Sequence, residues 1–143
     1  MRVLNTFRHP NERLRDTGVL IGRLLLAALF VIDGWSKVTN FVPAGAYMSA
    51  FGVPSVLLPL VILTEVGGGL CLIVDWQTRV AALALAGFCI MAAILFHANF
   101  ADRNQLLHFQ KDLAIAGGLL VLFACGAGGW SLDRRDVVSS QHR

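Results

Sequence analysis

Long blocks of apolar residues, separated by short polar segments, set the pattern of this chain. Within each of the four blocks the apolar side chains follow one another, instead of forming the one-sided stripe of a surface helix. A helix needs roughly 20 apolar residues to cross a bilayer. The pattern therefore predicts four membrane-spanning helices, at about residues 19–37, 53–74, 80–97 and 112–128.

The polar segments indicate how these spans are connected. Residues 75–79 form a short connection, which predicts that the second and third spans are antiparallel neighbours. Phe41, Tyr47 and Phe51 lie between the first two spans and are typical of a segment at the membrane surface. The predicted fold is all-α, a polytopic membrane protein with a four-transmembrane-helix bundle. Its parts are a basic N-terminal segment, a transmembrane domain and a basic tail, at residues 1–18, 19–129 and 130–143.

The distribution of charge predicts the orientation. Hydrophobic residues make up 56% of the chain, and the formal net charge is +3. Lys and Arg outside the spans gather in the N-terminal segment, the 75–79 connection and the tail, so both termini are predicted to be cytoplasmic. The basic residues do not gather on one element, so we expect a lipid bilayer and no nucleic acid as surroundings. The first block is too long for a cleavable signal peptide and has no small-residue cleavage site, so it is interpreted as a retained span.

The second span contains an unusual acidic residue. Glu65 lies near its middle and is followed by Gly67, Gly68 and Gly69. A charged side chain at mid-membrane costs about 3 kcal/mol, so the carboxylate should face a partner or a wet cavity. The glycines favour close approach of neighbouring helices.

The first span carries Arg23, Asp33 and Lys37, which fall on one stripe at 100° per residue. A charged stripe on a spanning helix is expected to face the interior of the bundle. Arg23 is the only cation in the inner half of any span, so we predict an intramembrane ion pair between Arg23 and Glu65. The alternative is that Arg23 and Lys37 only extend to the membrane surface.

A second set of polar residues lies at the outer ends of the spans, and a bundle would bring its members together. This predicts a shallow polar cavity for a small polar or amphipathic molecule, with a histidine able to exchange protons near neutral pH. The alternative is that these residues cap helix ends and pair with each other. The set consists of Asp33, Lys37, His97, Lys111 and Asp112.

The sequence offers few ligands for a redox group. Only His97 lies close to a span, where two axial histidines would suit haem, and the carboxylates at depth are too few for a di-iron site. Cys71, Cys89 and Cys125 lie in apolar blocks without a CxxC motif, and are interpreted as small buried hydrophobic residues. We expect no metal and no tightly bound cofactor. Any electron carrier would be a diffusible quinone or belong to a partner.

Several motifs, taken in order, give the chain a family resemblance. They are Arg23, Phe30 and Gly34-Trp35-x-Lys37 in the first span, LTEVGGGL in the second, Thr78-Arg79, His97, Lys111, Gly117-Gly118 and the ending GAGGWSLDRR. Over about residues 18–135 the chain resembles the DoxX family of small bacterial membrane proteins. The resemblance implies four helices in the bacterial inner (plasma) membrane. Carried over by position, it implies functional polar residues at Arg23, Lys37, Glu65, His97 and Lys111, whereas Asp33 and Asp112 rest on the residue pattern alone.

Two classes of function stay open at this point, and with them the question of whether the chain is an enzyme. The family is described as quinol-oxidase-like or thiosulfate:quinone-linked, with members associated with oxidative-stress defence, which implies a quinone-associated redox subunit and a partner oxidoreductase. The alternative is a non-enzymatic membrane scaffold, or a module that binds and exports small molecules. The small residues of the third and fourth spans also make a homodimer plausible.

Overall fold

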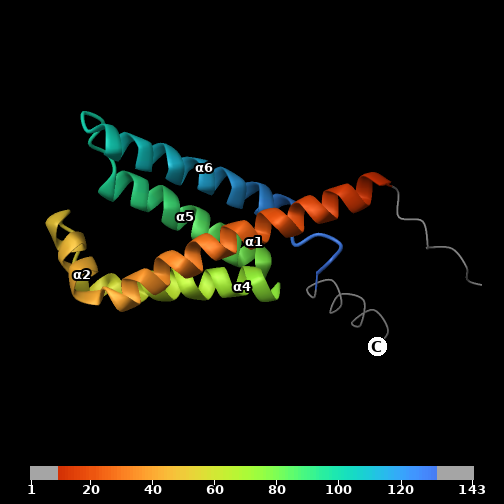
Figure 1. The fold of residues 1–143 in the computed structure, drawn as a ribbon, viewed down its shortest axis with the longest axis horizontal. Coiled ribbons are helices and arrows are strands. Elements are labelled where there is room, and N and C mark those ends of the chain that lie inside the picture. The colour runs from red at the N-terminus through yellow and green to blue at the C-terminus, as the bar shows by residue number, and fades with distance from the viewer. Residues whose placement is uncertain (1–9, 132–143) are drawn as a thin grey trace, which may run out of the picture.

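The computed structural model describes residues 10–131, which are helical with short connections and contain no strand. Figure 1 shows the long helices lying side by side, with a short helix at one end. Half of the predicted basic N-terminal segment and most of the tail lie outside the described residues. The elements in chain order are α1 (Pro10–Thr39), α2 (Phe41–Ala50), η1 (Ser55–Leu57), α3 (Leu58–Ile62), η2 (Leu63–Gly67), α4 (Gly68–Val74), α5 (Thr78–Phe96) and α6 (Arg103–Cys125).

Four helical stretches are long and apolar enough to cross a membrane, which confirms the predicted fold class. The first and fourth stretches begin well before the predicted spans, because polar residues ahead of the apolar blocks continue the helical turns. At the start of α6 the side chain of Asp102 accepts a hydrogen bond of 2.8 Å from the backbone N–H of Asn104, an N-cap that begins the helix well before residue 112. The four stretches are Asn11–Thr39, Ser55–Val74, Thr78–Phe96 and Arg103–Cys125.

The bundle has two ends that differ in content. We call the end where α1 begins and α6 ends the terminal end, and the end with α2 and the α5–α6 connection the loop end (Figure 1). Helices α5 and α6 form a closely packed antiparallel pair, and α1 packs mainly along η2 and α4. Contact between α1 and α6 is much sparser.

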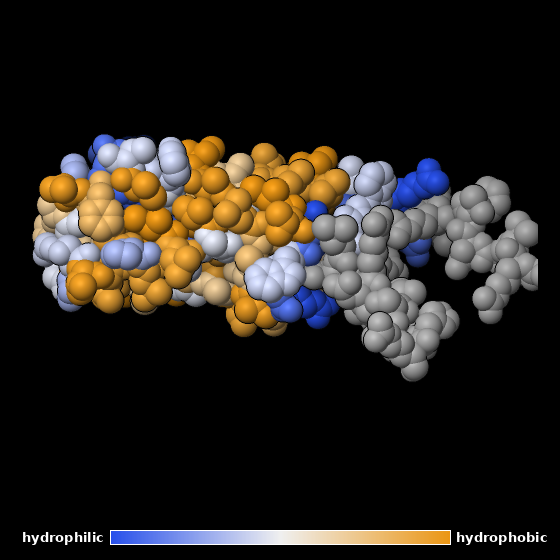
Figure 2. All heavy atoms as spheres, turned by 90° about the horizontal axis from the view of Figure 1, so that it is seen from below, coloured by the Kyte–Doolittle hydropathy of each residue, from blue (hydrophilic) through white to orange (hydrophobic). Residues whose placement is uncertain are grey.

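Small side chains and leucines fill the interior of the bundle. Leu72, Leu85 and Leu119 are fully buried, next to alanines of α1, α5 and α6. Most large apolar residues instead point outward, and Figure 2 shows them as a broad hydrophobic belt between more hydrophilic ends. A soluble monomer rarely exposes an apolar surface of this extent. The belt is therefore the surface that faces lipid.

The second span is not a uniform α-helix. It begins with a 3₁₀ turn, continues as α3, widens into a single π-helical turn at Leu63–Gly67 (η2), and returns to α-helix in α4. Single π turns inside helices are frequent at functional sites. Here the π turn contains Glu65, whose side chain is 2% exposed.

Glycines allow two close approaches to this span. A Cβ atom on Gly34 of α1 would lie 2.6 Å from Val66 Cγ2, and one on Gly69 would lie 2.8 Å from Val31 Cγ2. Gly68 faces the other neighbour, with Leu85 of α5 at 2.9 Å from its Cβ position. The expectation of close helix approach is thus confirmed at Gly68 and Gly69. Gly67 has no such role, since its Cβ position meets only Leu63 of its own span.

Candidate functional site

Lys37 of α1 joins two carboxylates at membrane depth. Its Nζ donates hydrogen bonds to Asp33 Oδ2 at 2.7 Å and to Glu65 Oε1 at 2.8 Å. The same Nζ lies 2.8 Å from Glu65 Oε2, but this second oxygen has no partner with hydrogen-bond geometry among the described residues. The cation that faces the buried acid is therefore Lys37, and one oxygen of that acid stays without a hydrogen bond.

The predicted ion pair between Arg23 and Glu65 is wrong, because Arg23 pairs with a different acid. Its Nη1 lies 2.5 Å from Asp75 Oδ1, and both side chains are 4% exposed. Nε and Nη1 of Arg23 meet no partner with hydrogen-bond geometry in residues 10–131, so opposite charge rather than hydrogen-bond alignment holds the pair. Thr78 Oγ1 donates to Asp75 Oδ1 at 2.8 Å and completes this network.

The register of α1 against the second span explains why Lys37, and not Arg23, pairs with Glu65. The two segments are antiparallel, with Arg23 opposite Asp75 near the terminal end and Lys37 opposite Glu65 further along. To meet Glu65, Arg23 would have to slide by about ten residues, or about 15 Å at 1.5 Å per residue. No side chain spans that distance, so each cation takes the acid at its own depth.

Asp75 is the residue that sequence reasoning missed. It ends α4 in the left-handed conformation, with φ of 61°, and this turn directs its side chain back towards α1. Aspartate tolerates that conformation better than most residues. The available signal was that Asp75 is the only acid in the 75–79 connection, on the side of the membrane where Arg23 lies.

His97 is held between two polar residues of α6. Its Nδ1 lies 2.7 Å from Gln105 Oε1 and its Nε2 lies 3.8 Å from Asp112 Oδ2. Nδ1 thus contacts the amide of Gln105, and Nε2 is the ring nitrogen that faces a carboxylate. The ring also stacks on His108 at a centroid distance of 5.0 Å. This is the geometry of an oriented acid–base group.

These residues surround one cavity of about 540 Å³ at the loop end. Its lining includes all five residues of the predicted polar set, together with Glu65. The expected convergence of these side chains is therefore seen, while their role in binding stays a prediction. The alternative that they pair with each other is seen too, in the contacts of Lys37 and His97. The polar lining consists of Asp33, Lys37, Tyr47, Glu65, His97, Asp102, Asn104, Gln105, His108, Lys111 and Asp112.

The cavity carries more acid than base. Four carboxylates and two ammonium groups line it, so with both histidines neutral an excess of negative charge remains. The histidines can offset that excess on taking up protons. A ligand that is cationic, or that accepts protons together with electrons, suits such surroundings.

Aromatic side chains close one side of the cavity. Tyr47 and Phe51 of the α2 region contact Phe96 of α5, with ring centroids 5.7 and 5.6 Å from that of Phe96. The sequence pattern placed the α2 region at the membrane surface, and in the structure it covers the loop end (Figure 1). Tyr47 and Phe96 are thus lining residues that the polar pattern alone did not select.

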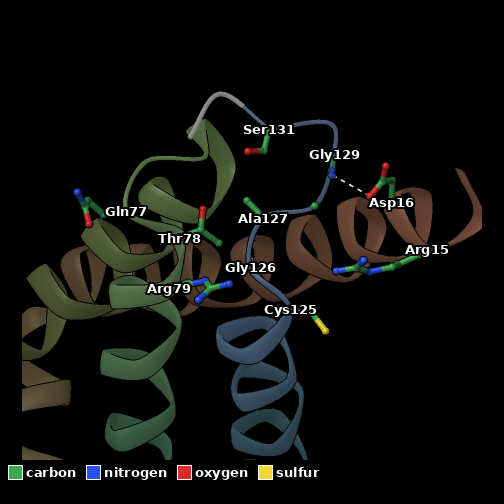
Figure 3. A pocket seen from close by; sticks show the side chains of 11 residues that line it. Arg15, Asp16, Gln77, Thr78, Arg79, Cys125, Gly126, Ala127, Gly129 and Ser131 are labelled. Carbon is green, nitrogen blue, oxygen red and sulfur yellow. Dashed lines mark hydrogen bonds between the residues drawn. The ribbon is translucent and has the colours of Figure 1, made fainter. Parts of the chain in front are cut away.

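A second hollow, of about 490 Å³, lies at the terminal end (Figure 3). Here the backbone N–H of Gly129 donates to Asp16 Oδ1 at 2.8 Å, which ties the C-terminal segment to α1. The guanidinium of Arg79 lies beside Gly126, at the end of α6, where a cation is favoured by the helix dipole. These contacts hold segments together, so we assign this hollow a structural role.

The cysteines differ more in their surroundings than expected. Cys89 is buried and Cys71 partly buried, but Cys125 at the end of α6 is exposed. The interpretation as a buried hydrophobic residue is therefore wrong for Cys125. Within residues 10–131, no group of three or more His, Cys, Asp or Glu side chains is placed to hold a metal ion.

The lipid-facing belt, the four spans and the charges buried between them define a multi-pass integral membrane protein. The DoxX family profile matches residues 18–98, and the chain belongs to this family. It is 47% identical over 123 residues to the inner membrane protein YqjF of Escherichia coli (strain K12), covering 86% of this chain and 95% of that protein. It is 29% identical over 141 residues to the inner membrane protein YphA of the same organism, covering 92% and 100%. No solved structure matches significantly. The protein is accordingly a multi-pass protein of the bacterial inner membrane.

Proposed function

We propose that the loop-end cavity binds a quinone, and that the protein acts as a quinone-associated subunit beside a partner oxidoreductase. The observation that carries this is the cavity itself, where Glu65 and His97 meet an apolar wall at membrane depth. Its volume lies within the range of about 300–1,000 Å³ usual for small-molecule sites. Lipid-soluble ring compounds with polar edges fit such a combination.

The lining supplies what quinone chemistry requires of a protein. Quinone carbonyls accept hydrogen bonds, and Lys37, Lys111 and His97 carry N–H donors that face the cavity. Reduction of a quinone to a quinol takes up two electrons and two protons. His97 beside Asp112 and the carboxyl of Glu65 are the groups that deliver the protons. In this scheme the partner oxidoreductase carries the redox group and supplies the electrons.

A second candidate function is favoured by the excess of carboxylates in the cavity. The same space would take a cationic amphiphile, and the protein would then be a non-enzymatic module for binding or exporting such molecules. A buried carboxylate and aromatic rings both attract an organic cation. The two functions differ in the ligand that the purified protein retains.

The deciding experiment uses protein purified gently in its native lipid. Bound quinone is extracted and quantified, and an absorption spectrum is recorded, for the wild type, for His97→Ala and for Arg79→Ala at the opposite end. We expect stoichiometric quinone in the wild type and in Arg79→Ala, and its loss in His97→Ala. Quinone no higher than the surrounding lipid accounts for would overturn the quinone assignment. Retention of an organic cation in its place would support the second function.

A further inference from the structure

A third, almost wholly apolar cavity of about 460 Å³ lies between the second span and α5. Its only polar side chain is that of Thr64, whose hydroxyl donates to the backbone oxygen of Leu60 at 2.9 Å within its own helix. No lining side chain of this groove therefore offers a free donor to water or to a polar ligand. The groove suits an apolar occupant.

The groove opens towards the bilayer rather than towards an aqueous face. Leu57 and Leu60 on one side, and Met91 and Leu95 on the other, line the groove and expose between 42% and 59% of their surface. All four lie on membrane-spanning stretches and belong to the hydrophobic belt. Whatever enters the groove comes from the lipid.

Small residues leave the space open. Gly87 lines the groove, and a Cβ atom there would meet no heavy atom within 4 Å. Ala84, one turn earlier on α5, lines it as well. This part of α5 therefore forms the wall of an open groove.

The groove and the polar cavity adjoin each other. Both are lined by the same side chains of α2, α3 and α5, namely Met48, Val61, Phe88, Ala92 and Phe96. A molecule with a polar head and an apolar tail can therefore place its head among the charged residues and its tail along the groove. Its tail never has to leave an apolar medium.

Because the two cavities share one wall, we infer that the site takes a tailed amphiphile directly from the bilayer, with the head in the loop-end cavity and the tail in the groove between the second span and α5. The inference rests on the proposed function, since it specifies the ligand of the same cavity. It excludes a small water-soluble molecule as the natural ligand. The shared aromatic residues Phe88 and Phe96 form the passage between head and tail sites.

The test compares a tailless benzoquinone with the same head group carrying a decyl tail. Binding is measured on the full-length protein in lipid nanodiscs, at equal lipid content, for the wild type, Gly87→Phe and Gly117→Phe. Gly117 of α6 is the matched control, because its Cβ position also has no heavy atom within 4 Å. We expect Gly87→Phe to weaken the tailed quinone by roughly tenfold and to leave the tailless one within about twofold. Gly117→Phe should leave both unchanged.

Ala84→Phe provides a second obstruction of the groove, further from the cavity. Unchanged affinity of the tailed quinone in both groove variants would overturn the inference, as would an equal loss of both quinones in both variants. If no quinone binds to the wild type, the proposed function fails by itself. The groove is then tested with tetramethylammonium against dodecyltrimethylammonium. Loss of only the tailed cation in Gly87→Phe would support the groove assignment, and no loss would overturn it.

Discussion

The two ion clusters of the bundle both join a basic side chain of α1 to carboxylates, and they differ in almost everything else. At the terminal end, Arg23 and Asp75 form a balanced pair, each 4% exposed, with Thr78 bound to the same acid. At the loop end, Lys37 serves two acids, Asp33 and Glu65, with exposed fractions from 61% down to 2%. A balanced, sealed pair is suited to holding helices together. An unbalanced cluster that faces a cavity is suited to binding a ligand and exchanging protons.

The largest effect is expected from breaking the sealed pair. Arg23→Met removes the cation that pairs with the buried Asp75 carboxylate, which should lower the free energy of unfolding by about 3–5 kcal/mol. The measurement is unfolding in mixed detergent micelles, with Arg15→Met as the control on an exposed part of the same helix. Adding Asp75→Asn, which keeps a residue that tolerates the left-handed conformation, should recover a large part of the loss, because both charges are then gone. Additive losses in the double variant would contradict a direct pair.

The next largest effect is expected at Gly34, which lies on α1 beside Asp33 and packs against the π turn that contains Glu65. An alanine there would meet Val66 at 2.6 Å and Glu65 Cβ at 3.1 Å, so α1 would have to move away from the π turn. We expect Gly34→Ala to cost about 1–3 kcal/mol of unfolding free energy, as overpacking does. The control is Gly117→Ala on α6, where space is open and alanine favours the helix. Equal stability of the two variants would argue against close packing of α1 on η2.

A smaller effect on stability is expected at Glu65. Glu65→Gln keeps the shape of the side chain and leaves Lys37 with Asp33, so the free energy of unfolding should fall by only about 1 kcal/mol. Bound quinone, measured by extraction from the same preparations, should nevertheless be lost. A stability loss as large as that of Arg23→Met would remove the distinction between the two clusters. Retained quinone would show that Glu65 is not needed for binding.

The smallest effect is expected at Asp33, whose side chain is 61% exposed. Exposed ion pairs contribute about 0–1 kcal/mol, and salt screens them. Asp33→Asn should therefore change unfolding only slightly, and the difference from the wild type should shrink further at high salt. A large, salt-insensitive loss would mean that Asp33 is buried in the membrane-embedded protein.

The fold and the charged stripe of α1 follow from the sequence, because both depend on local patterns. Apolar block length identifies the spans, and an angular spacing of 100° per residue places Arg23 and Lys37 on the inner face. Pairing between helices depends on register, which no local pattern records. The register is determined by the exact starts of the helices and by the left-handed turn at Asp75, which are features of the three-dimensional structure.

Only the part of the cavity that depends on local sequence pattern could be predicted. His97, Lys111 and Asp112 could be placed at one end of the bundle because each lies near the end of an apolar block. Tyr47 and Phe96 could not be assigned to the lining, since an aromatic residue near a span end is equally typical of the lipid interface. The α2 helix brings Tyr47 to the cavity by folding over the loop end, a tertiary contact.

The π turn at Leu63–Gly67 has a consequence for how this gene can change. A π turn accommodates one residue more than the α-helical turn it replaces, and each residue of an α-helix corresponds to a rotation of about 100°. Deleting one codon within this turn would leave the hydropathy of the span almost unchanged. It would let the turn close to an ordinary α-helical turn, so the parts of the span on either side would keep their orientation to one another. Deleting a codon in α4 would instead rotate Asp75 against Glu65 by about 100°. Single-residue deletions are thus expected to be tolerated better in the π turn than in α4.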